Sequence, residues 1–180
     1  MTELEHLADT IRRAHAGPAW HGPALSEVLH GVTAEQASRR VGDAHTIWEL
    51  AEHIIAWQDI VRRRIEGERL GDDNLTWEDN WPPVPEPTEQ NWRRTVERAA
   101  EANRRLCERM LNFGAGNLDR QVHGEGSAVP KLDSSVPGKD YTFAVMLHGA
   151  AQHVIYHAGQ IALLNKLIAA KPKGKSAQNS

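Results

Sequence analysis

The sequence has few of the features that would assign it to several large classes of protein. It contains one cysteine, Cys107, so no internal disulfide can form, and we expect a reducing, cytoplasmic location. Its formal net charge is −3 and its isoelectric point is about 6.4, whereas a nucleic-acid-binding protein needs a basic surface. Apolar stretches are too interrupted to span a bilayer, and the acidic N-terminus is unlike a signal peptide. We therefore expect neither nucleic-acid nor membrane partners.

Strand patterns are also scarce, because no run of alternating Val, Ile or Thr is bounded by turn residues. Apolar residues instead recur at helical spacing, which predicts four long helices over residues 2–16, 44–66, 88–113 and 141–170. Short helical pieces are expected at 24–30 and 33–39, and loops at 74–87 and 116–140. The sequence thus predicts an all-α four-helix bundle, a single domain over residues 1–170, with a disordered tail over 171–180.

The residues that stand out chemically are His153 and His157, which lie one helical turn apart on an apolar face. A buried imidazole needs a hydrogen-bond partner or a metal ion. His53 lies on the apolar face of the 44–66 helix at a similar depth, about 12–15 Å from its start, so it could be a third ligand. Three imidazoles suit zinc, nickel, copper or iron and leave a coordination position open, as in catalytic sites. The alternative is three separate histidines, each hydrogen-bonded on its own.

Several better-known site types do not fit the sequence. A zinc protease of the His-Glu-x-x-His type needs a glutamate after the first histidine, but Val154 follows His153. A ferritin-like di-iron site needs two Glu-x-x-His motifs, and only Glu3 and His6 have that spacing. No Gly-rich phosphate loop, Gly-x-Ser-x-Gly turn or Cys-x-x-Cys motif is present. His15 and the other scattered histidines are expected at the surface.

Three segments resemble the DinB/YfiT-like superfamily. They are Trp20-His-Gly-Pro-Ala-Leu, Ala44-His-Thr-Ile-Trp-Glu-Leu-Ala-Glu-His53, and His148-Gly-Ala-Ala-Gln-His153-Val-Ile-Tyr-His157-Ala-Gly-Gln-Ile161. The resemblance implies an up-down-down-up four-helix bundle with long crossover loops, often a homodimer. It also implies a divalent metal, commonly zinc or nickel, bound by His53, His153 and His157. Characterised relatives include S-transferases and an isomerase that use a low-molecular-weight thiol, and many others are described only as metal-dependent hydrolases.

The chemistry of such a site leaves three functions open. An ion held by three neutral ligands keeps its full positive charge and lowers the pKa of a thiol or water that it binds. Hydrolysis also needs a proton acceptor, for which Glu49 is the best candidate, although it could instead accept an imidazole N–H. Glu52 is expected to be an exposed helix carboxylate. Thiol transfer needs less proton machinery, so we favour a thiol-dependent S-transferase, with a hydrolase or a non-enzymatic, metal- or small-ligand-binding stress protein as alternatives.

A small-molecule substrate would meet side chains that lie one turn from the ligands. Trp57 follows His53 by one turn, while Tyr156 and Gln160 flank the last two histidines, so we predict these three residues as substrate-binding. Trp77, Trp81 and the 116–140 segment could form a pocket wall, but for each tryptophan taken singly we favour the alternative that it covers the end of the bundle. Cys107 has no histidine at helical spacing and is a poor nucleophile candidate.

Overall fold

The computed structural model describes residues 1–70, 75–122 and 141–170. Within these ranges the protein is all-α, as predicted; no strand forms, and a single isolated bridge joins Gln121 to Thr142. The long helices are α1 (Glu3–Ala16), α4 (Ile47–Ile65), α6 (Glu89–Leu111) and α7 (Phe143–Ala169). The short helices are α2 (Leu25–Leu29), α3 (Ala34–Ser38), α5 (Trp77–Asn80) and the 3-10 turn η2 (Ala115–Asn117). No helix in the described ranges is long and apolar enough to cross a membrane.

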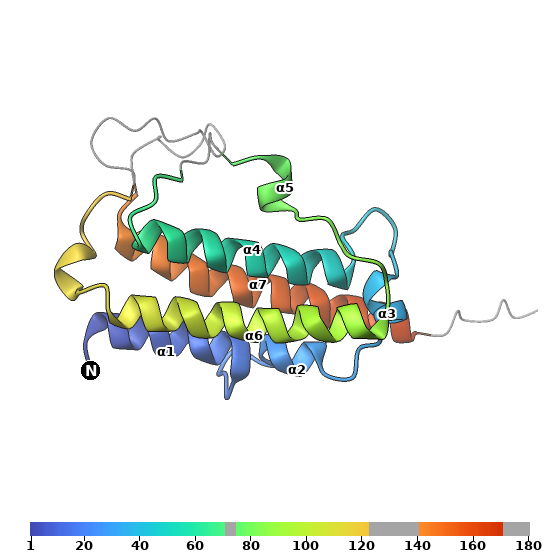
Figure 1. The fold of residues 1–180 in the computed structure, drawn as a ribbon. Helices are drawn as coiled ribbons and strands as arrows, with labels where there is room; N and C mark the ends of the chain where they lie inside the picture. The colour runs from blue at the N-terminus through green and yellow to red at the C-terminus, as the bar shows by residue number, and fades with distance from the viewer. Residues whose placement is uncertain (71–74, 123–140, 171–180) are drawn as a thin grey trace, which may run out of the picture.

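The four long helices lie side by side, and the short ones sit at the ends and along one side (Figure 1). In that view α1 and α7 run from left to right, whereas α4 and α6 run from right to left. Helices α1 and α4 each pack against both α6 and α7. Because α4 and α6 run the same way, the connection between them must return along the bundle, and α5, which it contains, packs beside α4.

Threonine begins six of the helices. In each case the hydroxyl oxygen accepts a hydrogen bond from a main-chain N–H of the first turn, and the six residues are Thr2, Thr33, Thr46, Thr76, Thr88 and Thr142. In α1, α3, α4 and α5 a side chain of the first turn also returns a bond to the N-cap residue, which completes a capping box. Each cap contributes about 1 kcal/mol. The box at Thr46, seven residues before His53, defines where α4 begins.

The core consists of two apolar clusters along the bundle. One is formed by α2, α3, the first half of α4 and the second half of α7, and the other by α1, the end of α6 and the first half of α7. In the first cluster the fully buried indole of Trp48 donates to Thr95 Oγ1 at 3.0 Å, which joins α4 to α6. A buried tryptophan contributes a large apolar surface and is stable there because its N–H has a partner.

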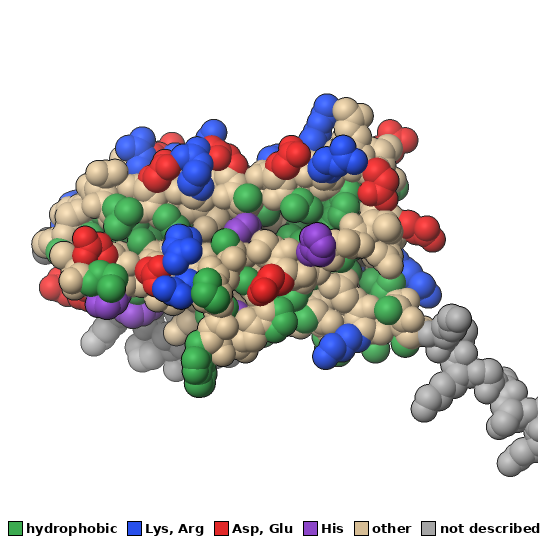
Figure 2. All heavy atoms as spheres, turned by 90° about the horizontal axis from the view of Figure 1, so that it is seen from below, with side chains coloured by type: hydrophobic (Ala, Val, Ile, Leu, Met, Phe, Trp, Pro, Cys, Tyr) green, Lys and Arg blue, Asp and Glu red, His purple; other side chains and the backbone are tan. Residues whose placement is uncertain are grey.

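Charged side chains of both signs are interspersed on the face shown in Figure 2, most densely along its upper edge. Ion pairs on α4 and α6 join opposite charges at short range, for example Arg62 to Asp59 at 2.5 Å and Arg109 to Glu66 at 2.6 Å. Pairs of this kind in contact with solvent contribute at most about 1 kcal/mol each. They keep the outer surfaces hydrated and do not position the core.

The structure corrects several details of the sequence prediction. The segment 74–87, predicted to be a loop, contains α5, which the capping box between Thr76 and Asp79 starts. The predicted helix 88–113 ends at Leu111, and the one predicted from residue 44 begins at Ile47 because Thr46 is its cap. His15, expected at the surface, is only 5% exposed within α1. The expected tail 171–180 and residues 123–140 of the expected long loop lie outside the described residues.

Candidate metal centre

His53 is held by two contacts that orient its ring. The register of α4 buries it, leaving 5% of the residue exposed. Its Nδ1–H donates to the main-chain oxygen of Asn80 at 2.6 Å; since a carbonyl can only accept, Nδ1 carries the proton and Nε2 a lone pair. The indole of Trp81 lies nearly parallel to the ring, with the centroids 4.0 Å apart. Both the tautomer and the direction of Nε2 are therefore defined by residues outside α4.

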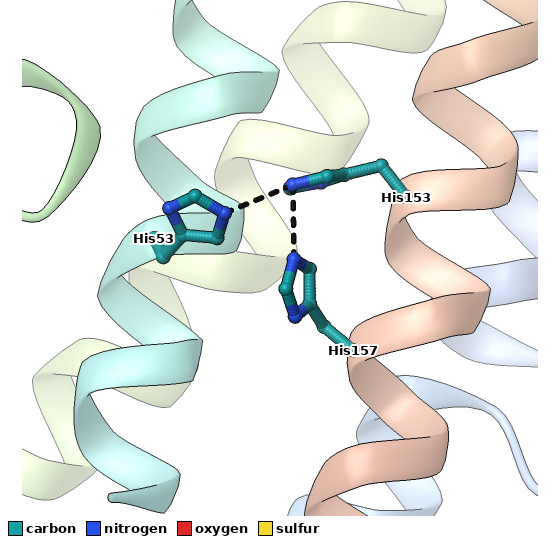
Figure 3. Close-up of side chains that lie close together, drawn as sticks. All are labelled: His53, His153 and His157. Carbon is teal, nitrogen blue, oxygen red and sulfur yellow. Dashed lines mark hydrogen bonds between the residues drawn. The ribbon is translucent and has the colours of Figure 1, made fainter. Parts of the chain in front are cut away.

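His153 and His157 come from successive turns of α7 and point toward α4 (Figure 3). Nδ1–H of His157 donates to Oε1 of Gln160 at 2.6 Å, a bond between residues one turn apart on the same helix. This bond leaves Nε2 of His157 with a lone pair, as the carbonyl of Asn80 does for His53. Gln160 thus acts on the site through the orientation of His157.

The three Nε2 atoms converge on one point between α4 and α7 (Figure 3). Nε2 of His153 lies 3.0 Å from that of His53 and 3.1 Å from that of His157. Nitrogen ligands about 2.0–2.1 Å from one ion are separated by roughly 2.9–3.4 Å, so this spacing suits a shared divalent cation. Without a cation, a single N–H on His153 could satisfy only one of the two lone pairs that face it. The three imidazoles are therefore better placed to bind one metal ion than to hydrogen-bond to one another.

The electrostatic environment keeps the imidazoles neutral. Burial, with a smaller contribution from nearby imidazoles, lowers the pKa of His53 to about 4 and that of His153 to about 3. Burial also lowers the pKa of His157, although the bond to Gln160 partly opposes this effect. Neutral imidazole is the form that binds a metal. No proton has to be displaced from the ligands at neutral pH.

A cavity of about 530 Å³ opens beside the three histidines, between α4 and α7. Its volume lies within the range of small-molecule sites in proteins. Apart from the ligands it is lined mainly by apolar and aromatic side chains, which are Trp57, Val61, Tyr141, Val145, Met146, Ala150 and Tyr156. The metal ligands therefore form one end of a cavity whose walls could hold a substrate.

Comparison with known proteins assigns the chain to a family. The family model of the DinB superfamily matches residues 19–161, which include all three histidines. The chain belongs to the DinB superfamily. No curated protein and no solved structure matches it. Family membership and the clustered histidines together indicate a metal-binding site in this DinB-superfamily protein.

The carboxylates next to His53 in this DinB-superfamily protein are engaged elsewhere. Glu49 closes the capping box of α4 and also pairs with Arg40 at 2.5 Å. Glu52, expected to be exposed, is only 2% exposed; it accepts a hydrogen bond from Thr95 at 2.8 Å and one from Arg98 at 3.0 Å. It is buried because it faces α6, where these two donors offset its desolvation. Neither carboxylate lines the cavity beside the histidines.

The three predicted substrate-binding residues have different positions. Trp57 and Tyr156 both line the cavity, and Tyr156 is 63% exposed at its edge. Gln160 contacts His157 and is not part of the described lining. For these three residues substrate binding stays a prediction. Gln160 also orients the candidate metal ligand His157 through its hydrogen bond.

Sequence reasoning missed the part that α5 plays at this site. Asn80 accepts from His53 with its main-chain oxygen and from Trp57 Nε1 with its side chain, the latter at 2.7 Å. Trp81 lies between His53 and His45, with its centroid 3.7 Å from that of His45. The Trp-rich composition of this segment was a signal for a pocket wall. A main-chain carbonyl, however, has no signature in a sequence, so the bond to His53 could not have been found.

Proposed function

We propose that this protein is a metal-dependent enzyme, and most directly a thiol-dependent S-transferase, with His53, His153 and His157 holding a divalent ion. Zinc and nickel are the ions we expect, because neutral imidazole suits both. Such an ion lowers the pKa of a thiol that it binds and so makes a nucleophile at neutral pH. The chain itself would orient the ligands, through Asn80 and Gln160, and hold the acceptor substrate in the adjoining cavity.

The observation that carries this proposal is the lack of a carboxylate in the described lining of the cavity. Hydrolysis requires a group that removes a proton from water and returns one to the leaving group. Glu49, the candidate for that role, is occupied by Arg40 and by the first turn of α4. A thiol loses its proton far more readily than water and needs no such base. The described residues thus suit thiol transfer better than hydrolysis.

We further infer that the protein acts on a small-molecule substrate, is located in the cytoplasm and forms a homodimer. A low-molecular-weight thiol stays reduced in the cytoplasm, and the lone cysteine, Cys107, fits that compartment. For the dimer, α7 presents exposed apolar side chains, with Leu163 59% and Leu167 48% exposed. Exposed apolar residues that recur along one helix are a common feature of subunit interfaces.

The metal site is tested by elemental analysis of purified variants. His53→Ala and His157→Ala should each lose the stoichiometric metal that the wild-type protein carries, since two imidazoles bind far more weakly than three. His148→Ala is the matched control, because His148 is an exposed histidine on the same helix and is not part of the cluster. Full metal content in both ligand variants would rule out the three-histidine site.

The activity is tested separately with the metal-loaded protein. A panel of electrophiles should be conjugated only when a low-molecular-weight thiol is supplied, and the rate should disappear in His53→Ala but persist in His148→Ala. Ester hydrolysis without any thiol would instead favour the metal-dependent hydrolase. Tight metal binding with no turnover of either panel would favour a non-enzymatic binding protein.

A further inference from the structure

The cavity beside the histidines extends well beyond the metal ligands. On α4 its lining runs from His53 to Arg64, and on α7 from His157 back to Val145. At 1.5 Å per helical residue these stretches correspond to roughly 16–18 Å. The two helices run in opposite directions, so the stretches lie alongside each other and form a groove with the ligands at one end.

The walls of this groove are mainly apolar, and the charged group in the lining, the guanidinium of Arg64, lies at the end away from the metal ligands. Val61, Met146 and Ala150 contribute hydrocarbon, and the ring of Trp57 lies next to them. Two of the polar side chains in the walls donate to other protein groups: Trp57 donates to Asn80 Oδ1, and Arg64 donates to the Tyr141 hydroxyl at 2.7 Å and to the main-chain oxygen of Leu70 at 2.8 Å. A ligand lying in the groove would therefore meet ring faces and methyl groups along most of its length.

We propose that this groove binds the apolar body of the acceptor substrate, an uncharged molecule that carries an aromatic ring or an alkyl chain next to its reactive carbon. As the substrate of a transferase this assignment rests on the proposed function, whereas binding itself does not. A hydrophilic thiol would lose its hydration in the groove without regaining hydrogen bonds, so it approaches the ligands from outside. The groove thus separates the apolar acceptor from the polar thiol.

Gly149 provides a direct way to test this assignment. It lies one turn before His153 on α7 and lines the groove. A Cβ atom added there would meet no heavy atom within 4 Å, so there is room for a side chain to start at this position of the groove wall. Gly159 is the matched control: it is also a helical glycine of α7 with nothing within 4 Å, but it is exposed and is not part of the lining.

The experiment measures binding of a neutral fluorescent dye, N-phenylnaphthylamine, to the full-length protein with and without metal. Gly149→Leu should weaken dye binding by about tenfold or more, which corresponds to roughly two buried methylene groups. Gly159→Leu should bind the dye like the wild type, and both variants should retain the metal content of the wild type. Equal dye affinity of Gly149→Leu and Gly159→Leu would overturn the assignment.

Displacement of the dye then defines the chemical class of the molecule that the groove binds. Straight-chain alcohols of increasing length should displace it with an affinity that rises about fourfold for each methylene until the groove is filled. Cysteine, a small hydrophilic thiol, should not displace it from metal-free protein. Displacement by cysteine as effective as that by the long alcohols would refute an apolar acceptor site. Because no step measures turnover, absence of transferase activity would leave this result standing and would overturn only the proposed function.

Discussion

Replacing His15 with phenylalanine should make the protein more resistant to acid. His15 is 5% exposed in α1, and its Nδ1 has no hydrogen-bond partner among the described residues. Burial lowers its pKa from 6.5 to about 4 because the charged imidazolium would lose its hydration. Between pH 6.5 and pH 4, His15 therefore stays neutral in the folded protein but is protonated in the unfolded chain.

The size of the effect follows from the two pKa values. Above pH 6.5 His15 is neutral in both states and contributes no pH dependence. As the pH falls from 6.5 to 4 the unfolded chain binds the proton and the folded protein does not, so the free energy of unfolding decreases. At 1.36 kcal/mol per pKa unit the decrease amounts to about 3 kcal/mol. Domains of this kind are stable by only about 5–15 kcal/mol in total, so the loss is easily measured.

Urea unfolding followed by circular dichroism, for wild type and His15→Phe at a series of pH values, measures this loss. The other histidines with lowered pKa are present in both proteins, so their contributions cancel in the difference between the two free energies of unfolding. That difference should be constant above pH 6.5 and should change by about 3 kcal/mol in favour of the variant by pH 4. If the free energies of unfolding of the two proteins, plotted against pH, stayed parallel over the whole range, the reasoning would be refuted.

Two further pairs of substitutions test contacts made by residues of α4 and by the α5 segment. Glu52→Ala leaves the buried Thr95 hydroxyl without its acceptor and should lower the free energy of unfolding by about 2–3 kcal/mol. Glu52→Gln keeps an acceptor for Thr95 and loses only the ion pair with Arg98. Because the Arg98 side chain is 55% exposed, that loss should lower the free energy of unfolding by about 1 kcal/mol or less. Equal losses in urea unfolding would contradict this assignment. Trp81→Leu removes the ring stacked on His53 and should weaken zinc binding about tenfold in competition with a chromophoric chelator. Asn80→Ala keeps the main-chain oxygen that accepts from His53 and should change zinc affinity much less; the reverse order would exclude Trp81 as a positioning residue.

Local signals in the sequence were sufficient for the long helices. Apolar periodicity predicted each of them to within three residues at the ends, because the helices bury the faces that carry the pattern. The helical piece expected at 33–39 also has a local signal, since Thr33 and Gln36 have the spacing of a capping box, which α3 forms. By contrast, α5 is only four residues long and has no buried residue, so periodicity could not detect it. Its capping pair, Thr76 and Asp79, was the one local signal that it offered.

The candidate site was predictable where its geometry lies within one helix and less so where it depends on packing. The spacing of His153 and His157 places both on one face of α7 wherever that helix packs. The approach of His53 depends on how α4 packs against α7; it was selected by its helix face and a match in depth, and the family resemblance then implied the same ligand. The burial of Glu52 was missed because its exposure depends on Thr95 and Arg98 in α6, and no spacing within α4 encodes their approach.

The groove arises from the unusual composition of α7. This helix carries no Asp, Glu, Lys or Arg from Phe143 to Asn165, so charge does not reveal which side faces solvent. An apolar stripe predicts burial, yet Gly149 and Ala150 on that stripe are only half-buried. They are too small to reach α4, and the space they leave opens onto Trp57. One turn further along, His153 and His157 are long enough to bridge the same gap and meet His53. Small side chains followed by two histidines thus produce, from one helix face, both the apolar groove and the metal ligands at its end.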